Sequence, residues 1–356
     1  MLGVRPGSVY RLLRRPLFLI PPERAHRLGM AVLRRLGPPQ SPLPAPGEPS
    51  LSVTSAGLRF SHPITLAAGF DKDAEAVEGF FALGFSAVEV GTVTPRPQPG
   101  NPSPRLFRLP QARALINRMG FNNHGMEAMA ERLEALRNRP GPVGVNLGKN
   151  KDTPLERATD DYLAATDRLG PLADYLVVNA SSPNTPGLRE LQQPEQLRAL
   201  LAAVKGRLSQ VAPGKPLLLK IAPDLEPEAV DAVVDVAVES GLSGLICTNT
   251  TLARPVQGRH AQEPGGLSGA PLAPLALATL RRASAQAQGR LTLWASGGIF
   301  TAEDVLERLR AGADLVQVYT ALVYEGPGFV RKLLRDLTTH LQSQGLRSLR
   351  ESVKSA

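Results

Sequence analysis

Short polar side chains are concentrated in the stretch NASSPNTPGL, residues 179–188. It follows ADYLVV, an apolar run typical of a buried strand. A single turn needs one or two such residues, whereas this segment holds two serines, two asparagines, two prolines and a glycine. Amides and hydroxyls at this density can donate to and accept from a polar ligand, and a serine can act as a base if its proton is passed onward. The pattern predicts a binding and catalytic corner.

Polar segments follow seven other apolar runs in the same way. They read AAGFDK, GTVTPRP, NLGKN, KIAPD, TNTT, SGGI and YTAL. Any one of them has an ordinary explanation as a polar turn. Eight together, with lysines and asparagines among them, favour a shared site.

A fold that gathers eight strand ends at one face would position these segments. Strand-like runs occur at PITLAAG, SAVEVGTVT, PVGVNLG, DYLVVNA, PLLLKIA, SGLICTNT, LTLWASGG and DLVQVYT, and most are separated by helix-like segments such as PEAVDAVVDVAVESG and TAEDVLERLRAG. This rhythm predicts an α/β fold, a (β/α)8 TIM barrel over residues 51–345, with reactive groups where strands end. A doubly wound open sheet is the weaker alternative, because no GxGxxG follows the first strand.

The residue types at the strand ends narrow the ligand. Gly297 and Gly298 allow close backbone approach after the seventh strand, where barrels often bind phosphate. Gly269 could serve the same anion or cap a turn. Further donors follow other strands: Asn146, Asn179, Lys220, Thr248, Tyr319 and Thr320. This set suits a flat heterocycle with carbonyls and ring nitrogens joined to a phosphate, such as FMN.

The reaction also needs a base, and the candidates are histidines, a cysteine and hydroxyls. None of the five histidines (His26, His62, His124, His260 and His340) stands at a predicted strand end. The single cysteine, Cys247, lies inside the sixth strand, which favours a buried structural thiol. The hydroxyls of SSPN remain, with Thr185 as a possible relay. No clustered metal ligands are visible, so we expect no metal site.

The amino-terminal segment differs from the rest of the chain. Residues 1–37, here called the head, hold eight arginines and one acidic residue, so they supply +7 of the net charge of +9. The head predicts two short amphipathic helices broken at IPP, the second opening at Pro22 and ending at Gly37. They could pack as a helical hairpin or lie on an anionic membrane surface, and aromatic residues are too few for nucleic-acid stacking.

The remaining boundaries follow from composition. A proline-rich linker is expected over residues 38–50, and a short carboxyl-terminal tail over residues 346–356. One cysteine excludes an internal disulfide framework and indicates a reducing compartment.

The quoted motifs together resemble the dihydroorotate dehydrogenases, and more narrowly their membrane-associated, quinone-using branch (class 2). The matching segments include AAGFDKDAEAVEGF, EVGTVTPRPQPGNPSPRLFRLP, INRMGFNNHG, GVNLGKNKDTP, VVNASSPNTPGLRELQ, KIAPDL, TNTTLARP, GGLSGAPL, ASGGI and VQVYTALVYEGP. They span nearly the whole predicted barrel, and the basic head matches too.

The resemblance implies oxidation of dihydroorotate to orotate in pyrimidine (UMP) biosynthesis, with one FMN per chain and a quinone as electron acceptor. It assigns FMN binding to Ala68, Gly69, Phe70, Asp71, Lys72, Thr92, Asn146, Asn179, Lys220, Thr248, Gly269, Gly298, Tyr319 and Thr320. It assigns substrate binding to Lys72, Asn117, Arg118, Met119, Gly120, Phe121, Asn184, Asn249 and Thr250. Ser182 takes the position of the base, Lys220 that of a charge stabiliser, and Thr185 and Phe121 those of groups that pass or shield the proton.

The same resemblance implies a quinone site and a location. His26 and Arg105 match residues that line the family's quinone tunnel. Ser182 distinguishes this branch from the soluble one, which has cysteine as its base and lacks the head. We expect a monomer, peripheral to the cytoplasmic side of a bacterial inner membrane, with no nucleic-acid partner. The alternatives are another FMN barrel, such as a dihydropyrimidine or dihydrouridine enzyme, and a basic membrane or nucleic-acid adaptor built on a non-catalytic barrel.

Overall fold

A computed structural model describes residues 6–37, 50–136 and 139–354, and its centre is a barrel of parallel strands. The strands are β3 (Ile64–Leu66), β4 (Val88–Val93), β7 (Val143–Leu147), β8 (Tyr175–Asn179), β9 (Leu217–Ile221), β10 (Gly244–Cys247), β12 (Thr292–Ser296) and β13 (Leu315–Val318). They pair in the closed order β10-β12-β13-β3-β4-β7-β8-β9. Each lies within one of the eight predicted runs, so the TIM-barrel prediction is confirmed.

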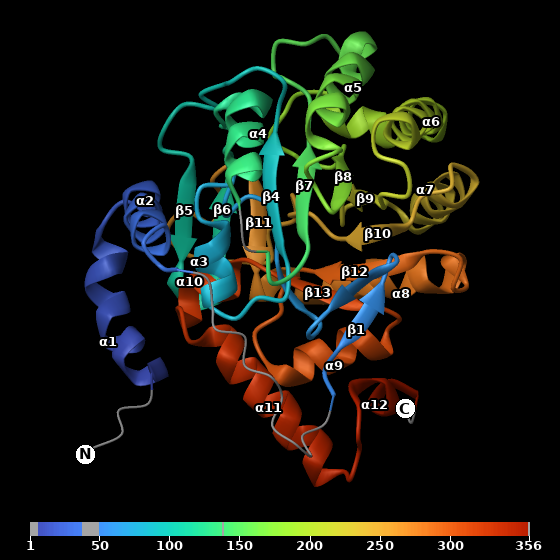
Figure 1. Cartoon of the computed structure of the whole chain (residues 1–356). Coiled ribbons are helices and arrows are strands. Elements are labelled where there is room, and N and C mark those ends of the chain that lie inside the picture. The colour runs from blue at the N-terminus through green and yellow to red at the C-terminus, as the bar shows by residue number, and fades with distance from the viewer. Residues whose placement is uncertain (1–5, 38–49, 137–138, 355–356) are drawn as a thin grey trace.

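Helices surround the barrel on its outside (Figure 1). They are α3 (Val77–Ala82), α4 (Gly125–Ala135), α5 (Ala158–Leu169), α6 (Pro194–Val211), α7 (Pro227–Glu239), α8 (Ala273–Ala287), α9 (Ala302–Arg310), α10 (Thr320–Glu325) and α11 (Phe329–Ser343). Short 3-10 turns, η1 (Pro110–Ala112), η2 (Leu155–Arg157), η3 (Leu188–Gln192) and η4 (Ala270–Leu272), precede or join these elements.

Local sequence explains where several helices begin. Pro227 stands in the first turn of α7, where its missing N–H costs nothing. A capping box opens α9: the Asp304 N–H donates to the Thr301 hydroxyl, and the Asp304 carboxylate accepts from the Thr301 N–H.

A hairpin closes the end of the barrel at which the parallel strands begin. Strands β1 (Val53–Ser55) and β2 (Leu58–Phe60) pair antiparallel. Phe60 packs edge-on against Trp294, whose indole N–H donates to the Ser55 hydroxyl at 2.9 Å. This seal leaves the opposite end as the place for a ligand.

Three short strands at the open end were not predicted. They are β5 (Leu106–Leu109), β6 (Ala114–Asn117) and β11 (Gly266–Gly269), paired antiparallel in the order β11-β6-β5. Each has four residues, too few for alternation to stand out in the sequence. This sheet carries Asn117 and Gly269 to the rim of the barrel.

The head forms two helices, α1 (Pro6–Leu19) and α2 (Pro22–Leu33), so α2 begins at Pro22 as expected but ends before Gly37. Residues 1–5 and 38–49, with nearly all of the expected linker, lie outside the described residues. The helix α2 contacts α3 closely, because a Cβ at Gly79 would lie 2.3 Å from the Leu33 carbonyl oxygen. Only a residue without a Cβ permits this approach.

The head exposes several large apolar side chains. Leu12 is 72% exposed and Leu19 is 87% exposed, and Leu13, Leu28 and Val32 are also exposed. Within the described ranges, no helix has the length and hydrophobicity to cross a bilayer. At the other end of the chain the expected tail contains a helix, α12 (Leu349–Lys354), and the Leu349 N–H donates to the Ser50 carbonyl.

Candidate active site

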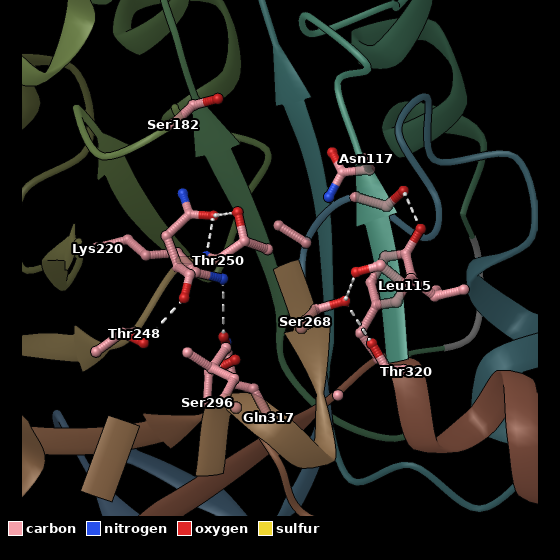
Figure 2. Close-up of a pocket in the computed structure, with 18 of the residues that line it drawn as sticks. Leu115, Asn117, Ser182, Lys220, Thr248, Thr250, Ser268, Ser296, Gln317 and Thr320 are labelled. Atoms are coloured by element: carbon pink, nitrogen blue, oxygen red, sulfur yellow. Dashed lines mark hydrogen bonds between the residues drawn. The ribbon is translucent and has the colours of Figure 1, made fainter. Parts of the chain in front are cut away.

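A cavity opens where the barrel strands end, and segments from every strand end except that of β7 contribute to its wall. Figure 2 shows Lys220 and Thr248 on one side of this cavity, Ser268 and Thr320 on the other, and Ser182 and Asn117 at its upper rim. The polar lining residues include Lys72, Thr92, Asn117, Asn179, Ser182, Asn184, Lys220, Thr248, Asn249, Thr250, Ser268, Ser296, Gln317, Tyr319 and Thr320. We call this space the mouth cavity.

Buried amides form the floor of the mouth cavity. The side-chain NH₂ of Asn179 donates to the Thr92 hydroxyl at 2.9 Å and to the side-chain oxygen of Asn146 at 3.0 Å. The side-chain oxygen of Asn179 accepts from the Ser181 hydroxyl at 3.0 Å and from the side-chain NH₂ of Asn249 at 3.3 Å. These bonds fix the orientation of each amide before a ligand arrives, which is the preorganisation that binding sites require.

The loop after β8 holds Ser182 beside the side-chain amides of Asn184 and Asn117. The Asn184 N–H donates to Ser182 Oγ at 3.2 Å, and the Asn184 side chain donates to the Asn117 carbonyl oxygen at 3.1 Å. A backbone N–H directed at the serine oxygen stabilises negative charge there and helps it lose its proton. Thr185 is buried in the same loop.

One guanidinium joins this loop to two others. Arg189 donates to the Ser181 carbonyl at 3.1 Å and to the Thr250 carbonyl at 3.1 Å. It also forms an ion pair with Asp224 at 2.8 Å. The loops after β8, β9 and β10 are therefore held together at a single side chain.

Two lysines supply positive charge at different points of the mouth cavity. Lys220 is buried and lies 3.4 Å from the Gln317 carbonyl oxygen, and burial lowers its pKa. Lys72 donates to the Gly69 carbonyl at 2.9 Å. Burial lowers the pKa of Lys72 to about 8. Both are placed to attract negative charge in a space with little water.

The opposite side of the mouth cavity presents glycines and hydroxyls. Gly297 and Gly298 follow β12, and a Cβ at Gly298 would lie 2.3 Å from the Cβ of Ala273. The Ser268 and Thr320 hydroxyls are hydrogen-bonded at 2.8 Å. Small residues and paired hydroxyls make this end suited to a compact anion such as a phosphate.

A second cavity lies between α2 and the barrel, and we call it the head cavity. His26 packs against Phe70 with ring centroids 5.2 Å apart, and Phe70 packs against Tyr319 at 5.0 Å. Burial, followed by the charge of Lys72, lowers the pKa of His26 to about 3, so its ring is neutral. The wall shared with the mouth cavity consists of Lys72, Leu106, Met119 and Tyr319.

The head cavity is held by ion pairs between the head and the barrel. Arg105 forms an ion pair with Glu23 of α2 at 3.0 Å and donates to the Asn101 carbonyl at 2.8 Å. Arg108 donates to the Ile20 carbonyl at 2.8 Å, between the two head helices.

Comparison with known proteins decides the family. The family model for dihydroorotate dehydrogenase matches residues 50–341. The chain belongs to the dihydroorotate dehydrogenase family. A curated relative from Myxococcus xanthus, named dihydroorotate dehydrogenase (quinone), is 61% identical over 97% of both chains. A relative of the same name from Rhodospirillum rubrum is 52% identical over 97% of this chain and 94% of its own.

Solved structures agree with the barrel architecture. The crystal structure of the Eimeria tenella DHODH in complex with ferulenol has a TM-score of 0.86 and 41% identity, covering 93% of this chain and 94% of that one. The ligand-free form has a TM-score of 0.85 and 42% identity, covering 93% and 98%.

FMN follows from membership of the dihydroorotate dehydrogenase family, and the mouth cavity fits this cofactor. Amide side chains and Lys220 face one part of the cavity, as a ring system with carbonyls and ring nitrogens requires. The glycine and hydroxyl side fits the phosphate. Lining residues that the sequence assigned to FMN are Ala68, Gly69, Lys72, Thr92, Asn179, Lys220, Thr248, Gly269, Gly298, Tyr319 and Thr320.

Five residues assigned to this dehydrogenase site lie outside the described lining of the mouth cavity. Phe70 faces the head cavity, and the Asp71 carboxylate accepts from backbone N–H groups before α3. Arg118 forms an ion pair with Glu263 at 2.8 Å. The Asn146 side chain is buried against that of Asn179, and Thr185 is buried in the loop after β8. Adjacency in the sequence did not reveal which way these side chains point.

Polar residues that sequence reasoning missed also line the mouth cavity: Ser268, Ser296 and Gln317. Gln317 and Ser296 are polar side chains in otherwise apolar strands, a signal that could have identified them. The assigned substrate residues Asn117, Met119, Gly120, Phe121, Asn184, Asn249 and Thr250 are in the lining.

One group of side chains in the described residues has the spacing of metal ligands, although none was expected. Ligand atoms of Asp73, Glu75 and His124 lie within 4.8 Å of one another. Glu75 forms ion pairs with Arg34 and Arg132, and Asp73 contacts His124. These partners explain the cluster without an ion.

Proposed function

We propose that this chain oxidises dihydroorotate to orotate in the mouth cavity and passes the electrons to a membrane quinone in the head cavity. One observation carries the proposal: two cavities, one rich in amides and one beneath the head, share the wall formed by Lys72, Leu106, Met119 and Tyr319. A non-catalytic adaptor has no use for such a pair of cavities.

In the mouth cavity, the FMN-assigned residues that line it would hold one FMN per chain, and the bound cofactor supplies the two-electron acceptor. Asn117, Asn184 and Asn249 would orient the pyrimidine-dione through its ring edge. Lys72 would hold the substrate carboxylate as a point charge. These contacts place the reacting carbons against the cofactor and exclude water.

Ser182 is the proposed base. Oxidation forms the C5=C6 double bond: C5 loses a proton and C6 loses a hydrogen with its electron pair. As the Ser182 oxygen takes the C5 proton it releases its own hydroxyl proton, and the Asn184 N–H that it accepts at 3.2 Å stabilises the oxygen. The buried Thr185 in the same loop is the proposed next carrier of that proton, with Phe121 as a shield from water. Lys220 balances negative charge that develops in the cavity.

The head cavity is the proposed quinone site. His26 and Arg105 line it together with Phe70, so a quinone ring would meet both aromatic faces and a fixed cation. The neutral His26 ring can donate one hydrogen bond to a quinone oxygen.

The head is the proposed membrane-binding element. Its exposed leucines would enter the acyl boundary and its arginines would attract anionic lipid. Dihydroorotate dehydrogenases of the quinone-dependent type are membrane-associated in general, and we place this chain on the cytoplasmic side of a bacterial inner membrane, as a monomer without a nucleic-acid partner. The proposed division of the chain stays that predicted from the sequence: 1–37 head, 38–50 linker, 51–345 barrel and 346–356 tail.

The test is dihydroorotate oxidation by the purified protein with a short-tail quinone, fumarate or NAD as acceptor. Quinone should support turnover and the other two should not. Cofactor reduction without preference for quinone would contradict the role of the head cavity, and absence of cofactor reduction by dihydroorotate would contradict the reaction.

A further inference from the structure

A carboxylate lies beneath the mouth cavity and plays no part in the proposed chemistry. Glu89 of β4 is fully buried inside the barrel. One of its oxygens accepts from the Asn146 amide at 2.9 Å, and the other accepts from the Gln317 amide at 2.5 Å. Burying a charge in a barrel core is costly unless it is paired and hydrogen-bonded, so its presence requires an explanation.

Glu89 first determines how the amide side chains beneath the mouth cavity are oriented. An ionised carboxylate only accepts hydrogen bonds, so Asn146 must turn its NH₂ group toward Glu89. The Asn146 carbonyl oxygen then faces upward and accepts from Thr92 and Asn179. Asn179 in turn presents its carbonyl oxygen to Asn249. One carboxylate therefore orients a chain of amides that ends at a proposed substrate residue.

The second consequence concerns Lys220. Gln317 turns its NH₂ group toward Glu89, and its carbonyl oxygen lies 3.4 Å from the Lys220 ammonium. Burial lowers the pKa of Lys220 and raises that of Glu89, and the charge of each partner opposes the shift of the other. Each charge thus offsets part of the cost of burying the other, with Gln317 between them.

One other titratable group faces Glu89 inside the barrel. Burial, followed by the charge of Glu89, raises the pKa of Tyr175 well above its usual value. Tyr175 therefore stays neutral at any pH in which the protein is handled. The pH response of this region depends on Glu89 and Lys220.

We infer that Glu89 is a positioning residue, which fixes the amide polarity of the floor and keeps Lys220 an ammonium directed at the mouth cavity. The catalytic role of the Lys220 charge in this inference rests on the proposed function. It assigns no contact with substrate or cofactor to Glu89 itself.

The test compares Glu89→Gln with wild type in the FMN-loaded protein. The variant leaves Lys220 buried without its counter-charge, so the pKa of Lys220 falls further below its unfolded value. The folded state then binds fewer protons than the unfolded state, and stability rises with pH between those two values. The unfolding temperature of Glu89→Gln should lie below that of wild type at pH 6, and the gap should narrow toward pH 9.

A matched variant isolates the pair. Lys220→Met removes the ammonium and leaves the Glu89 carboxylate buried without its counter-charge, so in this background Glu89→Gln should no longer lower the unfolding temperature at pH 6. If Glu89→Gln alone does not fold, folding of the double variant would support the pair, and failure of both while Lys220→Met folds would overturn it. An equal loss of unfolding temperature at pH 6 in both backgrounds would also overturn it.

A cofactor readout extends the test to the site. Removal of the Glu89 charge alone raises the midpoint potential of bound FMN, whereas loss of the Lys220 proton lowers it, so the potential of Glu89→Gln should fall more steeply with rising pH than that of wild type. Reduction by dihydroorotate should slow about ten- to hundredfold. Wild-type turnover is measured in parallel: its absence would contradict the proposed function, while the stability comparison would still test Glu89 and Lys220.

Discussion

The mouth cavity and the head cavity share a wall but are built in different ways. The mouth cavity is enclosed by strand ends whose side chains hydrogen-bond to one another, as with Asn179, Asn146 and Thr92. The head cavity is bounded on one side by a helix that is held by long side chains such as Arg105 and Arg108. The mouth cavity is therefore fixed by bonds between strand ends, and the head cavity by contacts between the head and the barrel.

This difference suits the two proposed half-reactions. Removing a proton and an electron pair from neighbouring carbons needs atoms held to within a fraction of an ångström. Binding a quinone that diffuses in a membrane needs an opening toward the bilayer, with apolar surface around it. The two sites lie side by side, and Lys72 and Tyr319 face both.

Replacing Ser182 should break the mouth cavity's chemistry most severely. In Ser182→Ala the proposed base is lost, so cofactor reduction by dihydroorotate should fall about 10²- to 10⁴-fold. Anaerobic stopped-flow absorbance measures this step. Ser181→Ala is the matched control, because the Ser181 hydroxyl donates to Asn179 in the same loop. A larger loss in Ser181→Ala than in Ser182→Ala would show that Ser182 is not the base.

Arg189 tests whether the rigidity of the mouth cavity matters. Arg189→Leu releases the loops after β8, β9 and β10 at once, so kcat/KM for dihydroorotate should fall about tenfold or more. Arg189→Lys keeps the charge but cannot reach three acceptors, so it should recover little activity. Steady-state kinetics distinguish the outcomes, and full activity in Arg189→Leu would show that the loops hold their positions without it.

The affinity for orotate should depend on pH through Lys72, which lies in the wall between the two cavities. Its pKa is about 8, lowered by burial, so the lysine is charged below that pH and loses its proton above it. Affinity for orotate, a carboxylate, should be constant below about pH 8 and fall by up to about tenfold for each pH unit above it. Titration of the FMN absorbance with orotate between pH 6 and 10 measures this, and Lys72→Met should give a flat profile. A flat wild-type profile would contradict the assignment.

The smallest effect is expected at the edge of the head cavity. In His26→Ala an aromatic contact and one hydrogen bond to quinone are lost, so KM for a short-tail quinone should rise about three- to tenfold. Cofactor reduction by dihydroorotate should be unchanged. A slower reduction step in this variant would show that the two cavities are not independent.

The sequence predicted the barrel because each barrel strand is a continuous apolar run followed by polar residues. It also placed Ser182, Lys220 and most donors correctly at strand ends. It does not show the direction of each side chain: the Asp71 carboxylate accepts from backbone N–H groups just before α3, and Arg118 pairs with Glu263. A side chain's direction depends on packing partners far away in the chain.

The four-residue strands β5, β6 and β11 and the buried Glu89 were missed for a related reason. Each β-strand of that small sheet is stable only because its neighbours supply hydrogen bonds, so no single segment carries the signal. Glu89 stands in an apolar run, and its partners Asn146 and Gln317 come from strands that are remote in sequence.

The most direct test of the central claim is to measure the two half-reactions separately in wild type, Ser182→Ala and His26→Ala. Cofactor reduction by dihydroorotate should collapse only in Ser182→Ala. Reoxidation of the reduced protein by a short-tail quinone should slow only in His26→Ala. Equal losses in both steps for either variant would contradict the division of labour between the mouth cavity and the head cavity.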